Sequence, residues 1–137
     1  MRSHIVVLAG LLFATGAVAD ERQLVQLPPM MQQHMLGNMR DHLRSLNEIL
    51  QDLAAGDGDK AADVAEQRLG MSSLAAHGAS HMAPFMPPHM RDTGTEMHHA
   101  ASRFARVAQE GDLPAAYAAL AKVTAQCVAC HEAYRIR

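Results

Sequence analysis

The stretch DLPAAYAALAKVTAQCVACHEAYRIR (residues 112–137) combines a helical pattern with a cysteine motif. Asp112 can cap a helix, and Pro114 is tolerated in the first helical turn. Alternating spacings of 4 and 3 residues, typical of the inward face of a bundle helix, separate Leu113, Tyr117, Leu120, Thr124, Cys127, His131 and Tyr134. The stretch therefore predicts a helix that packs through this face, with Cys127 and His131 turned inward.

The only two cysteines of the chain, Cys127 and Cys130, stand directly before His131. C-x-x-C-H is the attachment sequence for c-type haem. Two thiols one helical turn apart can form thioethers with the two vinyl groups of the porphyrin, and the histidine can bind the iron as proximal ligand. A redox C-x-x-C would need a βαβ setting, a zinc site would need a fourth ligand, and a disulfide would give His131 no role. We expect one covalent haem c.

Two further helices are expected in the first part of the chain. One begins after Pro28-Pro29 and ends near residues 54–59, where the sequence reads AAGDGD. Its apolar residues recur at spacings of 3 and 4: Leu36, Met39, Leu43, Leu46, Leu50 and Leu53. The other runs from about Asp59, as the N-cap, to about Ala76.

A third helix precedes the motif-bearing one. Glycine and prolines in residues 77–90 exclude a single regular helix there. Thr93 and Glu96 fit a capping box, so the helix is expected to run from Thr93 to about Gly111. No alternating strand pattern is found. Four helices with short links predict an all-α, antiparallel four-helix bundle. The expected core includes Leu43, Leu46, Leu50, Phe104, Tyr117 and Leu120.

The N-terminus indicates export. Arg2 precedes a short apolar run, and Ala17-Val18-Ala19 forms an A-x-A cleavage site before Asp20. We expect residues 1–19 to be a signal peptide cleaved after Ala19, residues 20–137 to form one domain, and the mature protein to reside in the periplasm. Cleavage removes one basic residue and no acidic one, so the formal charge moves from −2 to −3. That balance, without a basic run, argues against nucleic acid as a partner.

A single C-x-x-C-H near the C-terminus, on the last of four helices, resembles the class II cytochromes c, the cytochrome c-prime group. The ending CVACHEAYR (residues 127–135) is similar to the ending of that family, and the order of helices agrees from about Leu27 onward. The resemblance implies a bundle with haem c held by Cys127 and Cys130, and His131 on iron. It also implies that Tyr134 and Arg135 lie in the haem pocket, and that the protein forms a homodimer through its first two helices.

The sixth iron position separates two functions within this family. Electron carriers place a first-helix methionine on the iron and are low-spin, whereas high-spin members bind small gases such as nitric oxide. Met31, Met35 and Met39 form a stripe at intervals of 4 in the first helix. Thioether sulfur is an established axial ligand. We expect Met35 on the iron, with Met39 or Met31 as alternatives; His34 should point away from this face.

These ligands predict a periplasmic one-electron carrier that meets its redox partners transiently. The alternative is a high-spin protein that binds nitric oxide or another small gas, with Leu36 shielding the iron. Residues 71–99 are also rich in methionine and histidine, side chains that suit copper, but no spacing among them is a strong metal signature. Copper binding is therefore the weaker hypothesis. No nucleophilic triad, P-loop or nucleotide fingerprint is present, so no enzyme activity is expected.

Overall fold

A computed structural model describes residues 20–137; the expected signal peptide lies outside the described residues. Four longer helices, three short helical segments and two short strands follow one another along the chain. They are β1 (Gln23–Leu24), α1 (Pro29–Ala54), α2 (Gly58–Arg68), the 3-10 turn η1 (Met71–Ser73), α3 (Ala79–Met82), the 3-10 turn η2 (Ala83–Phe85), α4 (Pro88–Ala108), α5 (Leu113–Ala133) and β2 (Tyr134–Arg135).

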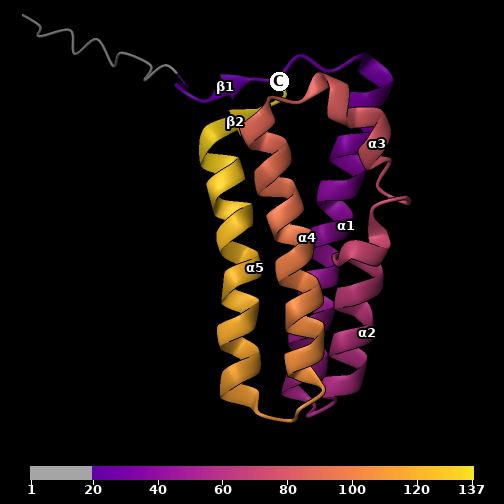
Figure 1. Cartoon of the computed structure of the whole chain (residues 1–137), viewed down its shortest axis with the longest axis vertical. Helices are drawn as coiled ribbons and strands as arrows, with labels where there is room; N and C mark the ends of the chain where they lie inside the picture. The colour runs from indigo at the N-terminus through magenta and orange to yellow at the C-terminus, as the bar shows by residue number, and fades with distance from the viewer. Residues whose placement is uncertain (1–19) are drawn as a thin grey trace, which may run out of the picture.

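Helices α1, α2, α4 and α5 run side by side along the long axis of the molecule (Figure 1). Helix α2 packs against both α1 and α4, and α4 packs against α5. Helix α3 and the two strands lie at the end where the chain terminates (Figure 1). The predicted all-α bundle is therefore confirmed.

Proline, aspartate and glycine set the ends of the helices. Helix α1 begins at Pro29, where the missing amide hydrogen costs no hydrogen bond. The Asp57 side chain accepts from Lys60 N (3.1 Å) and caps α2, two residues before the expected cap at Asp59. Asp112 caps α5 as predicted and accepts from Ala115 N (3.1 Å). The preceding Gly111 takes a φ of 76°, a conformation that favours glycine.

Two predicted helix boundaries are wrong. Helix α2 ends at Arg68, earlier than the expected Ala76. Helix α4 begins at Pro88, before the expected Thr93, because proline is favourable in the first turn and Pro87 holds the preceding extended backbone. Thr93 therefore lies inside α4, where its hydroxyl donates to the carbonyl of His89 (2.9 Å) instead of capping the helix.

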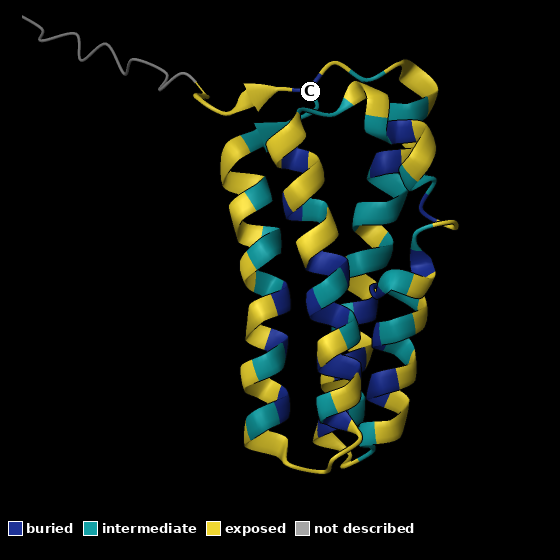
Figure 2. Cartoon of the chain, in the orientation of Figure 1, coloured by how far each residue is buried: buried dark blue, intermediate teal, exposed yellow. Residues whose placement is uncertain are grey.

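The main core lies among α1, α2, α4 and α5, where buried residues face one another (Figure 2). Phe104 and Leu120 belong to it as predicted, and Leu46 packs against its edge. Three predicted core residues are exposed: Leu43 (69%), Leu50 (46%) and Tyr117 (42%). They line a groove of about 990 Å³ between α1 and α5. The buried face of α1 instead contains Met35, Ser45, Ile49 and Leu53.

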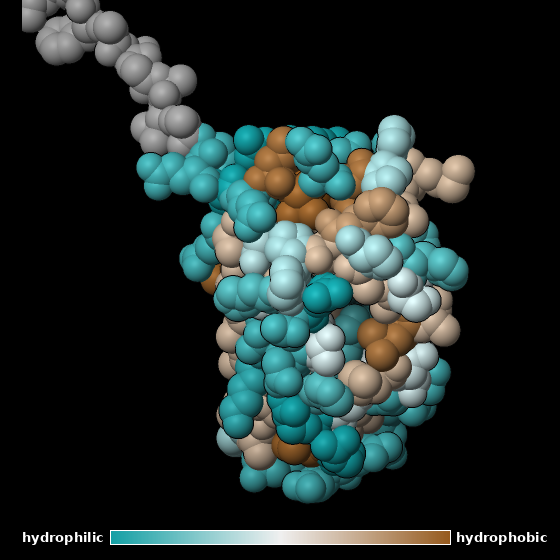
Figure 3. Space-filling view, turned by 45° about the horizontal axis from the view of Figure 1, so that its top comes forward, coloured by the Kyte–Doolittle hydropathy of each residue, from teal (hydrophilic) through white to brown (hydrophobic). Residues whose placement is uncertain are grey.

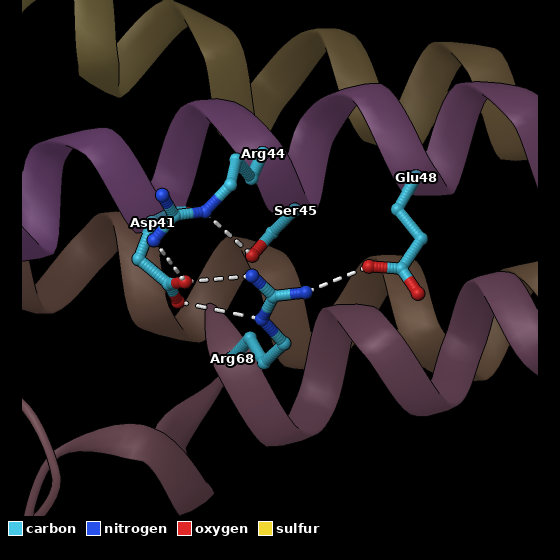
Figure 4. Close-up of polar contacts among 5 residues, drawn as sticks. All are labelled: Asp41, Arg44, Ser45, Glu48 and Arg68. Carbon is cyan, nitrogen blue, oxygen red and sulfur yellow. Dashed lines mark hydrogen bonds and ion pairs between the residues drawn. The ribbon is translucent and has the colours of Figure 1, made fainter.

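An ion-pair network joins α1 to α2 beside this rotated face. The Arg68 guanidinium lies between Asp41 and Glu48 (Figure 4) and makes contacts of 2.6 Å to Asp41 Oδ1 and 2.7 Å to Glu48 Oε2. The hydroxyl of Ser45 donates to the Asp41 carbonyl (2.8 Å), so this polar side chain is buried at little cost. Because α1 is turned toward α2, the row that carries Leu43 and Leu50 faces outward.

The two strands are an addition to the predicted fold. Gln23 pairs with Tyr134 and Leu24 with Arg135 in a parallel register, and Val25 N donates to Arg135 O (2.8 Å). Strands of two residues are too short for an alternating pattern to predict them. The pairing holds the segment that follows residue 20 against the chain directly after the cysteine motif.

Helix α5 is the described helix that is long and apolar enough to span a membrane, by length and composition alone. In its most apolar 18-residue window, 17% of the residues are buried. Much of its apolar character comes from alanine, which is also common in helices of soluble bundles.

Candidate functional site

The cysteine motif occupies the last turns of α5. Cys127 packs against the main core and Cys130 against a second apolar cluster, and both thiols are free and half-buried. His131 is exposed, which corrects the expectation that it faces the interior. The face of α5 that α4 covers runs through Ala116, Leu120 and Val123. His131 instead continues the outer row of Tyr117 and Thr124, which borders the gap toward α1.

The second cluster, here called the methionine cluster, closes the end of the bundle beside Cys130. Figure 3 shows hydrophobic surface at this end between hydrophilic side chains. Its buried members are Val25, Met35, Met82 and Met90, and its partly buried members are Leu27, Met39, Met86, Cys130, Tyr134 and Ile136. The cluster thus gathers side chains from α1, α3, α4, α5 and the segments around β1 and β2 next to one thiol of the motif, that of Cys130.

The first-helix methionines differ in their surroundings. Met35 is buried in the methionine cluster and Met39 packs against its edge. Met31 is half-buried and does not belong to the cluster. His34 is exposed, and its Nε2 lies 2.9 Å from the carbonyl oxygen of His77. The structure thus places Met35 in the same cluster as Cys130 and turns His34 elsewhere.

Sequence reasoning missed that Met82 and Met90 are buried beside Met35. They belong to the methionine- and histidine-rich segment that was considered for copper. The segment divides in the fold, because Met82, Met86 and Met90 join the methionine cluster while His81 and His89 remain exposed. Periodicity could not have found this arrangement, since the short helices α3 and η2 interrupt it.

Tyr134 and Arg135, the other expected pocket residues, follow the motif in β2. Tyr134 packs against the methionine cluster. The buried Nε of Arg135 lies 3.6 Å from Asp20 Oδ2, an ion-pair distance longer than a hydrogen bond. Arg135 therefore places a positive charge, paired with Asp20, at this end of the bundle.

These residues fit the haem c that the motif implies. A largely apolar, methionine-lined cluster can enclose a flat apolar ring. Cys130 packs against this cluster, Cys127 lies one helical turn away against the main core, and the exposed His131 follows Cys130 directly. Burial raises the pKa of Cys127 and of Cys130, so both remain neutral thiols in the folded apoprotein.

Three histidines form a separate, mostly buried group, here called the histidine cluster. It contains His42 of α1, His77 before α3, and His98 of α4. Ring centroids lie 4.7 Å apart for His42–His77, 5.5 Å for His77–His98 and 6.3 Å for His42–His98. Within residues 20–137, no group of three or more His, Cys, Asp or Glu is arranged to hold a metal ion.

Burial is the main cause that lowers the pKa of each of these histidines. The pKa of His42 falls to about 4, and repulsion from His77 and His98 contributes to this shift. All three rings are therefore neutral at neutral pH.

Acidification should accordingly destabilise the fold. Between its ordinary pKa of 6.5 and the folded value of about 4, His42 binds more protons in the unfolded state. Stability is therefore lost as the pH falls through this window, and roughly 3 kcal/mol of unfolding free energy should disappear between pH 7 and pH 4 through this residue. Urea unfolding at several pH values measures the loss. A His42→Gln variant should lose less, and an equal loss in the variant would contradict this assignment.

Comparison with known proteins connects the motif to a family. Residues 85–135 match the family model described as Cytochrome C', a range that contains α4, α5 and the motif. Neither the curated proteins nor the solved structures contain a match to the chain.

Proposed function

We propose that the chain is a low-spin one-electron carrier of the periplasm, because its residues 85–135 match the Cytochrome C' family model, and members of that family carry electrons or bind gases. The family implies covalently bound haem c. When bound, haem supplies a one-electron couple at its iron. The chain's own residues have three tasks: to hold this group, to ligate it and to limit rearrangement on electron exchange.

Each of these tasks has a candidate residue. Cys127 and Cys130 would hold the haem covalently, His131 would bind the iron from α5, and Met35 would bind it from α1. The observation that carries the proposal is the burial of Met35 in the same cluster as Cys130. A thioether already packed in a rigid core needs little movement to remain a ligand in both oxidation states, and a methionine ligand raises the reduction potential.

Electron exchange would take place with transient partners. The mature charge of −3 favours weak electrostatic guidance over a permanent complex. A second copy could also cover the exposed row of Leu43, Leu50 and Tyr117 in the groove between α1 and α5, a different surface from the first two helices through which the family resemblance implies a homodimer.

Replacing Met35 should test the proposal directly. The ferric protein is expected to be low-spin by EPR and to show a sulfur-to-iron charge-transfer band. Met35→Ala should abolish that band and give a high-spin signal, because no other side chain occupies the same position on α1. Met39→Ala and Met90→Ala are matched controls in the same cluster and should retain the band.

The outcomes separate three readings. If Met39→Ala, Met82→Ala or Met90→Ala removes the band instead, the carrier function stands and the ligand assignment is wrong. If the wild-type ferrous protein is high-spin and binds nitric oxide at once, the carrier proposal is wrong and the gas-binding alternative holds.

A further inference from the structure

His42, the member of the histidine cluster that belongs to α1, lies on the same face of that helix as Met35. His42 follows Met35 by seven residues, two helical turns, which corresponds to roughly 10 Å along the axis. His131 contributes repulsion to the lowered pKa of His42, which places the two imidazoles in the same electrostatic environment. A charge at the proposed iron site would therefore be felt at His42.

Hydrogen bonds determine which ring nitrogens of the cluster carry hydrogen. The Nδ1 of His98 lies 2.7 Å from the Leu69 carbonyl, which can only accept, so this nitrogen is the donor. The hydroxyl of Ser73 donates to Gly70 O (2.7 Å) and is left to accept from Nδ1 of His77 (3.3 Å). The Nε2 atoms of His77 and His98 then carry lone pairs, since a neutral imidazole has one N–H.

His42 stands apart from the other two. Its Nε2 is buried and has no hydrogen-bond partner within residues 20–137. A buried ring nitrogen without a partner is costly and needs an explanation in function. The His77 ring lies 4.7 Å away by centroids and is tilted by 57°, so it packs against His42 without a hydrogen bond to it.

We propose that His42 takes up a proton in acidic solution when the haem is reduced, so that electron transfer by this protein is coupled to proton uptake at low pH. The inference rests on the proposed carrier function. The electron comes from the one-electron donor protein and the proton from solvent water. An N–H bond forms at the imidazole as the positive charge at the iron falls by one, so each proton taken up offsets the charge that one electron brings.

The charges around His42 leave its ring neutral before reduction and still allow it to be protonated afterwards. On α1, Asp41 favours the protonated ring, but its carboxylate is already engaged by Arg68 of α2. His77, His98 of α4 and His131 of α5 oppose protonation. His34 of α1 opposes it at His77. No carboxylate within residues 20–137 forms a hydrogen bond to His42. A change of one unit of charge at the iron is therefore large compared with the other charges that act on this ring.

The expected size follows from distance. For a separation on the order of the Met35–His42 rise along α1, roughly 10 Å, and an effective dielectric constant of about 20, loss of one positive charge should raise the proton affinity of His42 on the order of tenfold. The reduced state then binds the proton more tightly, so the reduction potential should rise as the pH falls. A tenfold difference in affinity corresponds to a rise of about 59 mV for a one-electron couple. The rise should centre between pH 4 and pH 6.

Spectroelectrochemical titration of the haem-loaded protein between pH 4 and pH 8 tests the inference. The wild type should show the rise, His42→Gln should lose most of it, and His81→Gln, an exposed histidine outside the cluster, should behave as the wild type. A rise that persists in His42→Gln, or a wild type without a rise, would overturn the inference.

A second measurement keeps the test decisive if His42→Gln fails to load haem. NMR titration of the wild-type His42 ring in the ferric and ferrous states should give a higher pKa in the ferrous state, and equal values would overturn the inference. Failure of the carrier function is distinguishable, because it would appear as a high-spin spectrum. An intact low-spin spectrum without pH dependence would contradict only the proton uptake.

Discussion

A Cys127→Ser/Cys130→Ser double variant is expected to be purified without covalently bound haem, whereas the wild type should carry one haem per chain. A serine hydroxyl does not form the thioether, and the chain has no other cysteine. Intact mass after export through a functioning haem-maturation system measures the difference. Acid–acetone extraction should leave the colour with the wild-type protein and remove any colour from the variant.

One of the two residues between the cysteines provides a matched control. Val128 is exposed (54%) and contributes to neither apolar cluster, so Val128→Ser introduces the same side chain without removing a thiol. This variant should keep its haem. A covalently loaded double variant, or a colourless wild type whose two thiols both react with a thiol reagent, would refute haem attachment at this motif.

The parts of the molecule that the sequence predicted depend on local signals. The motif needs only the spacing of Cys127, Cys130 and His131. Proline before α1 and Asp112 before α5 act within one helical turn, so their effects are visible in the sequence. The family match over residues 85–135 supports the class that this local pattern indicates.

The incorrect parts depend on contacts distant in sequence. Hydrophobicity placed Leu43 and Leu50 in the core, but α1 packs against α2 through an adjacent face, beside which Arg68 pairs with Asp41. Ser45 is buried there because its hydroxyl has a backbone partner, which a hydrophobic pattern does not register.

The histidine cluster also depends on contacts between residues that are distant in sequence. His42, His77 and His98 come from three segments that no motif connects, and only packing brings them together. Met82 and Met90 likewise reach the site through α3 and the start of α4. The sequence could identify the cofactor motif but not the groups that would modulate it.

Phe104→Ala is expected to destabilise the haem-loaded protein by about 3–5 kcal/mol, the range for a large aromatic removed from a packed core. Phe104 is 0% exposed and is the largest fully buried side chain among the described residues. It belongs to the core cluster to which all four long helices contribute, so the cavity would lie where neighbouring backbones cannot easily close it. Urea unfolding at neutral pH, followed by circular dichroism, measures the loss.

Leu43→Ala is the matched comparison, because hydrophobic spacing alone assigns both residues to the core. At 69% exposure Leu43 loses few contacts on truncation, and its cost should stay within about 0.5 kcal/mol. The comparison should be made at two protein concentrations, since a cost that grows with concentration would reveal a second copy covering the groove. Leu43→Ala could instead cost as much as Phe104→Ala at both protein concentrations. That result would show that α1 faces the core through its leucine row, and that the pairing of Arg68 with Asp41 is wrong.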